Sequence, residues 1–201
     1  MLFRSSAIIL LQEGGRILSS QPFWRNLFAV NTLAGSLGSG ITLKALSALC
    51  MVAFLLLSLH SAQKAYLVPG DLTVKARSIP WLGIAGDRIP WGRLSVISAV
   101  LISLGTILLT VVTVTGFRLP SGWKEWVSSI PLLLLFAAIN AISEGILYRN
   151  GILGPLQGIL SDHRAAIGAA VLFGLAHYEG APGGPLGVVM SGLLGWYMCR
   201  S

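Results

Sequence analysis

Charge is what this sequence has least of. Only 10% of its 201 residues are Asp, Glu, Lys or Arg, whereas about a quarter of a typical soluble domain is charged. Hydrophobic residues make up 54% of the chain. This composition excludes an ordinary soluble domain and predicts a membrane protein, and the length suits a single domain.

Acidic residues are scarcer still, with 7 Asp and Glu against 14 Lys and Arg and a net charge of +7. The basic residues are scattered between apolar runs and do not gather in one patch. Scattered cations fit loops that touch anionic headgroups. The sequence therefore predicts the lipid bilayer as a partner and no nucleic acid.

Motifs for disulfides, metals and cleaved leaders are missing as well. Cys50 and Cys199 are far apart, and only two residues follow Cys199, so neither a disulfide framework nor a prenylation box is indicated. No H-E-x-x-H motif is present, which disfavours zinc, and we predict no metal and no cofactor. The stretch "AIILL" is too short for a signal-peptide core, so the membrane helices themselves are expected to direct insertion.

Long apolar runs are what the sequence does contain. A spanning helix needs about 20 apolar residues, and we predict an all-α, polytopic transmembrane bundle of about five to six membrane helices. The candidate helices are 45–63, 94–117, 130–148 with Pro131 in its first turn, 163–178 capped by Ser161 or Asp162, and a short one at 186–199.

The N-terminal part has a different character. Residues 27–43 are mildly apolar but broken by Asn31 and a Gly/Ser cluster. We therefore predict residues 1–44 to be an N-terminal interfacial segment and residues 45–201 to be the bundle. The whole is expected to be a multi-pass integral protein of the cell (inner) membrane.

One acid lies inside an apolar run, in "AISEGILYRNGIL" at 141–153. Glu144 is 14 residues beyond Ile130, about 21 Å into the third helix and so still within the hydrocarbon. Charged residues at this depth usually face a bundle interior and carry a function. Asn140 lies on the same helical face. Arg149 is rotated by about 140°, at the membrane boundary, and is poorly placed to neutralise Glu144.

The fourth helix offers a partner for this acid. Phe173 and His177 are four residues apart, one ring above the other. Small residues line the next stripe of this helix (Ala166, Ala170, Gly174) and one face of the fifth (Gly187, Ser191, Gly195). Small faces let helices approach closely, which could bring His177 within reach of Glu144.

A Glu and a His that share a wet pocket in a dry bundle can act as a general-base pair and activate water to attack a carbonyl. From the residues alone, a proton relay or ion pathway is as compatible as hydrolysis. Taken singly, Phe173 is more typical of core packing. Asn140 is more typical of an interhelical hydrogen bond.

These motifs resemble those of the CPBP family of intramembrane endopeptidases, which includes the CAAX prenyl protease type II enzymes and the bacterial Abi proteins. Glu144 and Arg149 in "EGILYRNG" match the first Glu and the Arg of the family's Glu-Glu-x-x-x-Arg motif, and Phe173 and His177 in "LFGLAH" match Phe-x-x-x-His. The resemblance covers roughly residues 80–201. It implies a glutamic-type peptidase without an obligatory metal, with Glu144 as general base and His177 as its partner. The implied substrate is a peptide bond of a membrane-associated protein, with its C-terminal region as one option.

Two departures from the family pattern stand out. Gly145 replaces the second Glu, and the sequence reaches Ser201 before the usual further helix with His-x-x-x-Asn, which fits a chain cut or naturally ended early. Loss of one oxyanion donor lowers turnover about a hundredfold or more. We expect Asn140, one turn before Glu144, to supply a substitute donor.

Two other classes remain open on the sequence. A non-catalytic CPBP-like protein, acting as an immunity or scaffold partner, is favoured by Gly145 and by the missing last motif. A small proton-coupled transporter would predict repeats or paired discontinuous helices, and the sequence has none.

Overall fold

The computed structural model describes the chain apart from residues 1, 31–32, 64, 66, 69, 77, 81–82, 85–87, 111–122, 181–182 and 200–201. It divides into two compact units. The first is Met1–Val68 with Leu132–Arg200, and the second is Pro69–Pro131 with Ser201.

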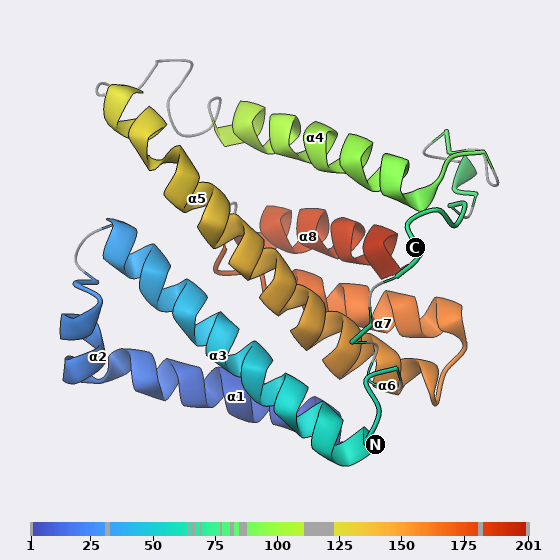
Figure 1. Cartoon of the computed structure of the whole chain (residues 1–201), viewed down its shortest axis with the longest axis horizontal. Helices are drawn as coiled ribbons and strands as arrows, with labels where there is room; N and C mark the ends of the chain where they lie inside the picture. The colour runs from blue at the N-terminus through green and yellow to red at the C-terminus, as the bar shows by residue number, and fades with distance from the viewer. Residues whose placement is uncertain are drawn as a thin grey trace. The chain divides into compact units, whose positions relative to one another are not determined.

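The first unit is made of helices. These are α1 (Leu2–Ser20), α2 (Pro22–Leu27), α3 (Leu33–Leu59), α5 (Trp123–Glu144, in this unit from Leu132), the π-helix η3 (Gly145–Leu153), α6 (Gly154–Gln157), α7 (Asp162–Leu175) and α8 (Gly184–Cys199). Figure 1 shows α7 and α8 side by side, and they are the most extensively packed pair of helices. The described residues contain no strand beyond two isolated bridges in the second unit, so the all-α prediction is confirmed.

The second unit holds α4 (Trp91–Thr110) and the first residues of α5. The predicted second span, 94–117, coincides with α4 as far as Thr110, and residues 111–117 lie outside the described part of the chain.

Ahead of α4, the Thr73 hydroxyl and the Thr73 amide both donate to the Asp71 carboxylate. These two hydrogen bonds lower the pKa of Asp71 below its ordinary value.

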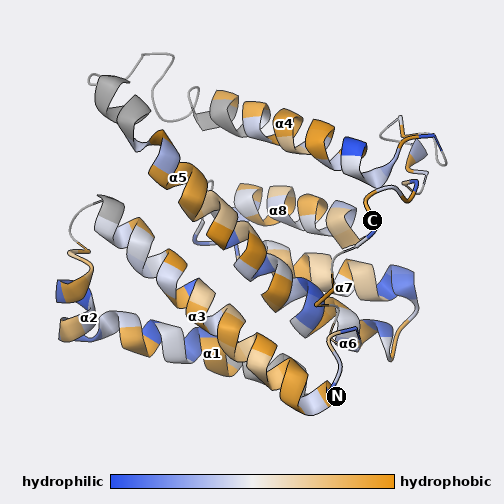
Figure 2. Cartoon of the chain, in the orientation of Figure 1, coloured by the Kyte–Doolittle hydropathy of each residue, from blue (hydrophilic) through white to orange (hydrophobic). Residues whose placement is uncertain are grey.

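Two helices are long and apolar enough to cross a membrane, within the described residues: Gly35–Leu59 and Ser129–Gln157. Figure 2 shows both largely in the hydrophobic colour. Large apolar side chains point outward from them, among them Leu49, Leu57 and Leu134. Exposed apolar surface on such long helices is what a lipid environment requires, and the prediction of a helical membrane bundle is confirmed.

The sequence suggested that the Gly/Ser cluster before residue 45 breaks the apolar segment. The structure shows a continuous helix there. α3 begins at Leu33 and runs through it. Buried Ser39 accepts a hydrogen bond of 2.8 Å from the indole of Trp24 in α2, and a side chain at Gly35 would collide with the carbonyls of Phe28 and Ala29. Small residues serve here as a packing surface between helical segments, a use common in membrane proteins.

The expected start of the third span is also corrected. α5 begins at Trp123, so Pro131 lies inside the helix and not in its first turn. The helical path does not stop at Tyr148 either, since it continues through η3 and α6 to Gln157.

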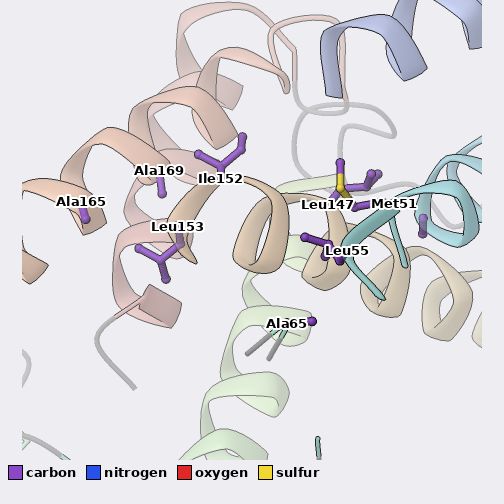
Figure 3. Close-up of a cluster of buried hydrophobic side chains, with 9 residues drawn as sticks. Met51, Leu55, Ala65, Leu147, Ile152, Leu153, Ala165 and Ala169 are labelled. Carbon is purple, nitrogen blue, oxygen red and sulfur yellow. The ribbon is translucent and has the colours of Figure 1, made fainter. Parts of the chain in front are cut away.

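The core of the first unit joins α3, η3 and α7. Met51 and Leu55 of α3 are completely or almost completely buried and lie beside Leu147 of η3, as Figure 3 shows. The far end of η3 packs Leu153 against Ala165 and other small residues of α7. This core fixes η3 between the two helices that supply the remaining groups of the candidate site.

Candidate active site

Glu144 is the last residue of α5, and the chain passes directly from it into the π-helix η3. A π-helix is rare and is often found at functional sites. Its hydrogen bonds link residues five apart and not four, so it changes which side chains lie over Glu144. Here the wider turn carries Leu147 and Asn150 into the interior and leaves Arg149 exposed.

The carboxylate of Glu144 is mostly buried, at 14% exposed, and it has a cation beside it. The ammonium of Lys44 in α3 donates to Glu144 Oε1 over 2.5 Å and to Asn140 Oδ1 over 2.8 Å. Asn140 and Glu144 therefore share a face of α5, as predicted. Their common contact is a lysine located 100 residues before the acid.

His177 approaches the same oxygen of Glu144. It lies in the turn that follows α7, where its amide donates to the Gly174 carbonyl. Its Nε2 is 3.8 Å from Glu144 Oε1, and its Nδ1 is 2.7 Å from the Phe173 carbonyl. Because a carbonyl can only accept, Nδ1 carries a proton, and in the neutral ring Nε2 then presents a lone pair toward Glu144.

Aromatic rings hold the imidazole in place. The Phe173 ring lies 4.5 Å from the His177 ring, centroid to centroid, and the Tyr148 ring meets Phe173 edge-on at 4.9 Å. Tyr148 comes from η3 and its hydroxyl accepts a hydrogen bond of 3.4 Å from Gln12 of α1. The aromatic contacts thus connect α7 to the segment that begins at Glu144.

Glycines bring the neighbouring helix close to these rings. A Cβ at Gly174 would lie 2.5 Å from the Val188 carbonyl oxygen, and a Cβ at Gly195 would lie 2.9 Å from Phe173. The backbone of α8 therefore presses against α7 and against the ring that supports His177. This is the close contact expected of the two small-residue faces.

Two open cavities meet at Lys44. The first, about 250 Å³, lies between α1, α3 and η3, and its polar lining includes Gln12, Arg16, Ser47, Glu144 and Tyr148. The second, about 420 Å³, lies between α3 and α5 and reaches Asn140 and Phe136. Lys44 lines both cavities.

The structure brings four of the five predicted site residues together: Glu144, His177, Phe173 and Asn140. Arg149 is exposed, and among the described residues the cation beside Glu144 is Lys44. Lys44 and Tyr148 were not predicted from the sequence as residues of the site. The available signal was the position of Lys44 directly before a long apolar run. Because α3 begins at Leu33, Lys44 lies inside this helix and not at its start.

The arrangement suits the handling of one water molecule. A carboxylate oxygen and an imidazole lone pair 3.8 Å apart are too far for a direct hydrogen bond, but a water can donate one proton to each. Among the described residues, no three His, Cys, Asp or Glu side chains gather to hold a metal ion.

Comparison with known families bears on the same region. Residues 126–201 match the model of the type II CAAX prenyl endopeptidase Rce1-like family. Over this segment, the chain is CAAX-protease-like. The resemblance inferred from the two motifs is confirmed there, while residues 80–125 of the expected family core lie outside the match. No curated protein and no solved structure matches the chain.

The CAAX-protease-like segment contains Glu144, His177 and Phe173, together with Tyr148 and Asn140. Lys44 and the α1 wall of the smaller cavity come from outside it. Together with the two apolar helices, the match indicates a membrane protein whose C-terminal segment is similar to type II CAAX prenyl endopeptidases.

Proposed function

We propose that the chain is an intramembrane endopeptidase that hydrolyses a peptide bond of a membrane-associated protein. The observation that carries the proposal is the 3.8 Å approach of His177 Nε2 to Glu144 Oε1. An acid from the end of α5 and an imidazole from the turn after α7 meet there, in a segment with a CAAX-protease-like sequence.

Glu144 acts as the general base in this mechanism. It takes a proton from water as the water oxygen bonds the carbonyl carbon of the substrate. His177 accepts the second hydrogen bond of that water at Nε2, since its Nδ1 is held by the Phe173 carbonyl. Phe173 and Tyr148 position the imidazole and do not touch the reacting atoms.

The substrate reaches the site from within the bilayer. We propose a multi-pass protein of the cell (inner) membrane, whose substrate is cleaved near its C-terminus. A prenylated C-a-a-X peptide is the probe that the name of the matched family suggests. Arg149, exposed beside the site, is proposed to contact lipid headgroups.

The test is cleavage of a quenched fluorescent, farnesylated C-a-a-X peptide by the full chain in liposomes. Glu144→Gln and His177→Ala should each lower kcat by at least about a hundredfold, because a general base and its partner contribute factors of that size. An unprenylated copy of the peptide shows whether the lipid is required.

Matched controls are present in the same unit. Glu13→Gln removes an exposed acid of α1 that pairs with Arg16, and His163→Ala removes an exposed histidine from the first turn of α7. Both should keep wild-type turnover. A wild-type rate no higher than that of Glu144→Gln, with all variants present in the membrane, would favour a non-catalytic partner role and contradict hydrolysis.

A further inference from the structure

We propose that Lys44 is a catalytic residue of this site, which donates a hydrogen bond to the oxyanion that forms on the substrate carbonyl. The proposal rests on the proposed peptidase function and adds to it a residue from outside the CAAX-protease-like segment. The observation behind it is that Lys44 Nζ and His177 Nε2 approach the same oxygen of Glu144.

The number of donors on Lys44 leaves room for a substrate. An ammonium group has three N–H donors. Those toward Glu144 Oε1 and Asn140 Oδ1 account for two. The described residues give the third no acceptor, and Lys44 lines both cavities with a side chain that is 45% exposed, although Glu144 is only 14% exposed.

The position of the ammonium group is also suitable. Nζ lies 2.5 Å and Nε2 lies 3.8 Å from Glu144 Oε1, so a water between Glu144 and His177 is within a few ångströms of the lysine. A substrate carbonyl attacked by that water can therefore direct its oxygen toward the third donor of Lys44. A donor already in place where negative charge develops stabilises the transition state without reorganisation at the moment of reaction.

Bond formation and cleavage proceed in two stages. Glu144 removes one proton from water, the water oxygen bonds the carbonyl carbon, and the carbonyl π electrons move to its oxygen. Lys44 donates a hydrogen bond to this oxyanion and keeps its proton. When the C=O bond forms again, the C–N bond breaks and the amine leaves with the proton that Glu144 held.

A purely structural role for Lys44 makes different predictions. Charged groups within membranes commonly pair with one another, so Lys44 could serve only to neutralise Glu144. In that case its loss should weaken every ligand to a similar extent. An oxyanion donor should instead matter for a tetrahedral, anionic ligand and not for the planar amide, because only interactions that strengthen in the transition state raise kcat.

The experiment compares Lys44→Met, Lys44→Arg and, as a control on an exposed loop lysine, Lys75→Met. Kinetics are measured with the farnesylated C-a-a-X peptide. Binding is measured with a phosphinate copy of this peptide and with an N-methylated amide copy that is not cleaved. Lys44→Met should lower kcat about a hundredfold or more and weaken the phosphinate similarly, with KM and amide affinity changed by less than about twofold.

Lys44→Arg should recover most of the turnover, since it restores a charged donor, and Lys75→Met should behave as the wild type. If Lys44→Met does not accumulate because Glu144 is left unpaired, Lys44→Met/Glu144→Gln is compared with Glu144→Gln. The double variant should still bind the phosphinate more weakly.

The opposite results separate the two proposals. Wild-type kcat in Lys44→Met, or equal weakening of both ligands, overturns the role of Lys44 and leaves the peptidase standing. A wild type no faster than Glu144→Gln overturns the peptidase, and the role of Lys44 with it.

Discussion

Asn140 and Glu144 each accept a hydrogen bond from the ammonium group of Lys44. These two bonds set the direction of the third N–H of that ammonium group. Asn140 Oδ1 accepts over 2.8 Å, from a residue one helical turn before the acid. Hydrogen bonds to charged groups contribute about 1.5–3 kcal/mol. Asn140 therefore positions the Lys44 ammonium through its amide oxygen, while its amide N–H donors leave the oxyanion role predicted from the sequence open to test.

Asn140→Ala should lower kcat about tenfold, because a freer ammonium spends less time in the productive position and about 1.4 kcal/mol corresponds to a factor of ten. The effect should be clearly smaller than that of Lys44→Met. Asn26→Ala on the exposed surface of α2 is the control. Unchanged peptide turnover in Asn140→Ala would show that Asn140 contributes nothing to this site.

Glu144, His177 and Phe173 could be predicted from the sequence as site residues, because each belongs to a motif with local spacing. Lys44 belongs to none. Its contact with Glu144 spans 100 residues of chain, and nothing in the spacing around residue 44 shows which helix α3 will face. A long-range ion pair of this kind depends on packing that a single sequence does not display.

The contact between α7 and α8 is set by the glycines on the facing surfaces of the two helices. A Cβ at Gly174 would lie 2.5 Å from the Val188 carbonyl oxygen and 3.1 Å from Gly192 Cα. Both neighbours are backbone atoms, which cannot rotate out of the way. An added methyl group must therefore push the helices apart.

Gly174→Ala should lower stability by about 1–3 kcal/mol, the usual range for overpacking, and should reduce turnover because His177 follows the same helix. Gly145→Ala is the matched variant, since among the described residues nothing beyond its chain neighbours and its own helix backbone lies within 4 Å of the Cβ position at Gly145. It should be neutral or slightly stabilising. Thermal unfolding in detergent checks both, and equal midpoints would refute the packing argument.

Element boundaries show where periodicity fails as a guide. α7 and α8 were predicted to within a few residues, because small-residue faces and a cap position mark them. The π-helix was not predicted, since apolar periodicity in "GILYRNGIL" looks the same for a continued α-helix. The early start of α3 was missed for another reason, because glycine and serine break helices in water but pack them in membranes.

The whole molecule combines outward-facing apolar helices with a polar site at the junction of α3, α5 and the turn after α7. Composition alone predicted the membrane class. It did not predict the division into two units, because that depends on which helices contact one another. Cysteine labelling can test whether the exposed apolar face of α3 is in contact with lipid.

Cys50 lies exposed in the middle of the apolar helix Gly35–Leu59. In a Cys199→Ser background it is the only cysteine of the chain. We expect Cys50 to resist a water-soluble maleimide in intact membranes and to react after denaturation, since lipid keeps both water and reagent away. A cysteine in place of exposed Gly70 should react in both states. Rapid labelling of Cys50 in sealed vesicles would place this face of α3 in water.

The smaller cavity is lined by residues from two distant parts of the chain. Glu144, Leu147 and Tyr148 belong to the matched segment, whereas the wall opposite is built by α1 and α3 from residues 11–47. The cavity beside Glu144 is thus built by two separate stretches of one polypeptide, and Lys44 belongs to the N-terminal one. Grafting the first 60 residues onto a relative of the C-terminal segment should therefore carry Lys44 with the α1 and α3 wall, and change turnover as well as substrate preference in the recipient.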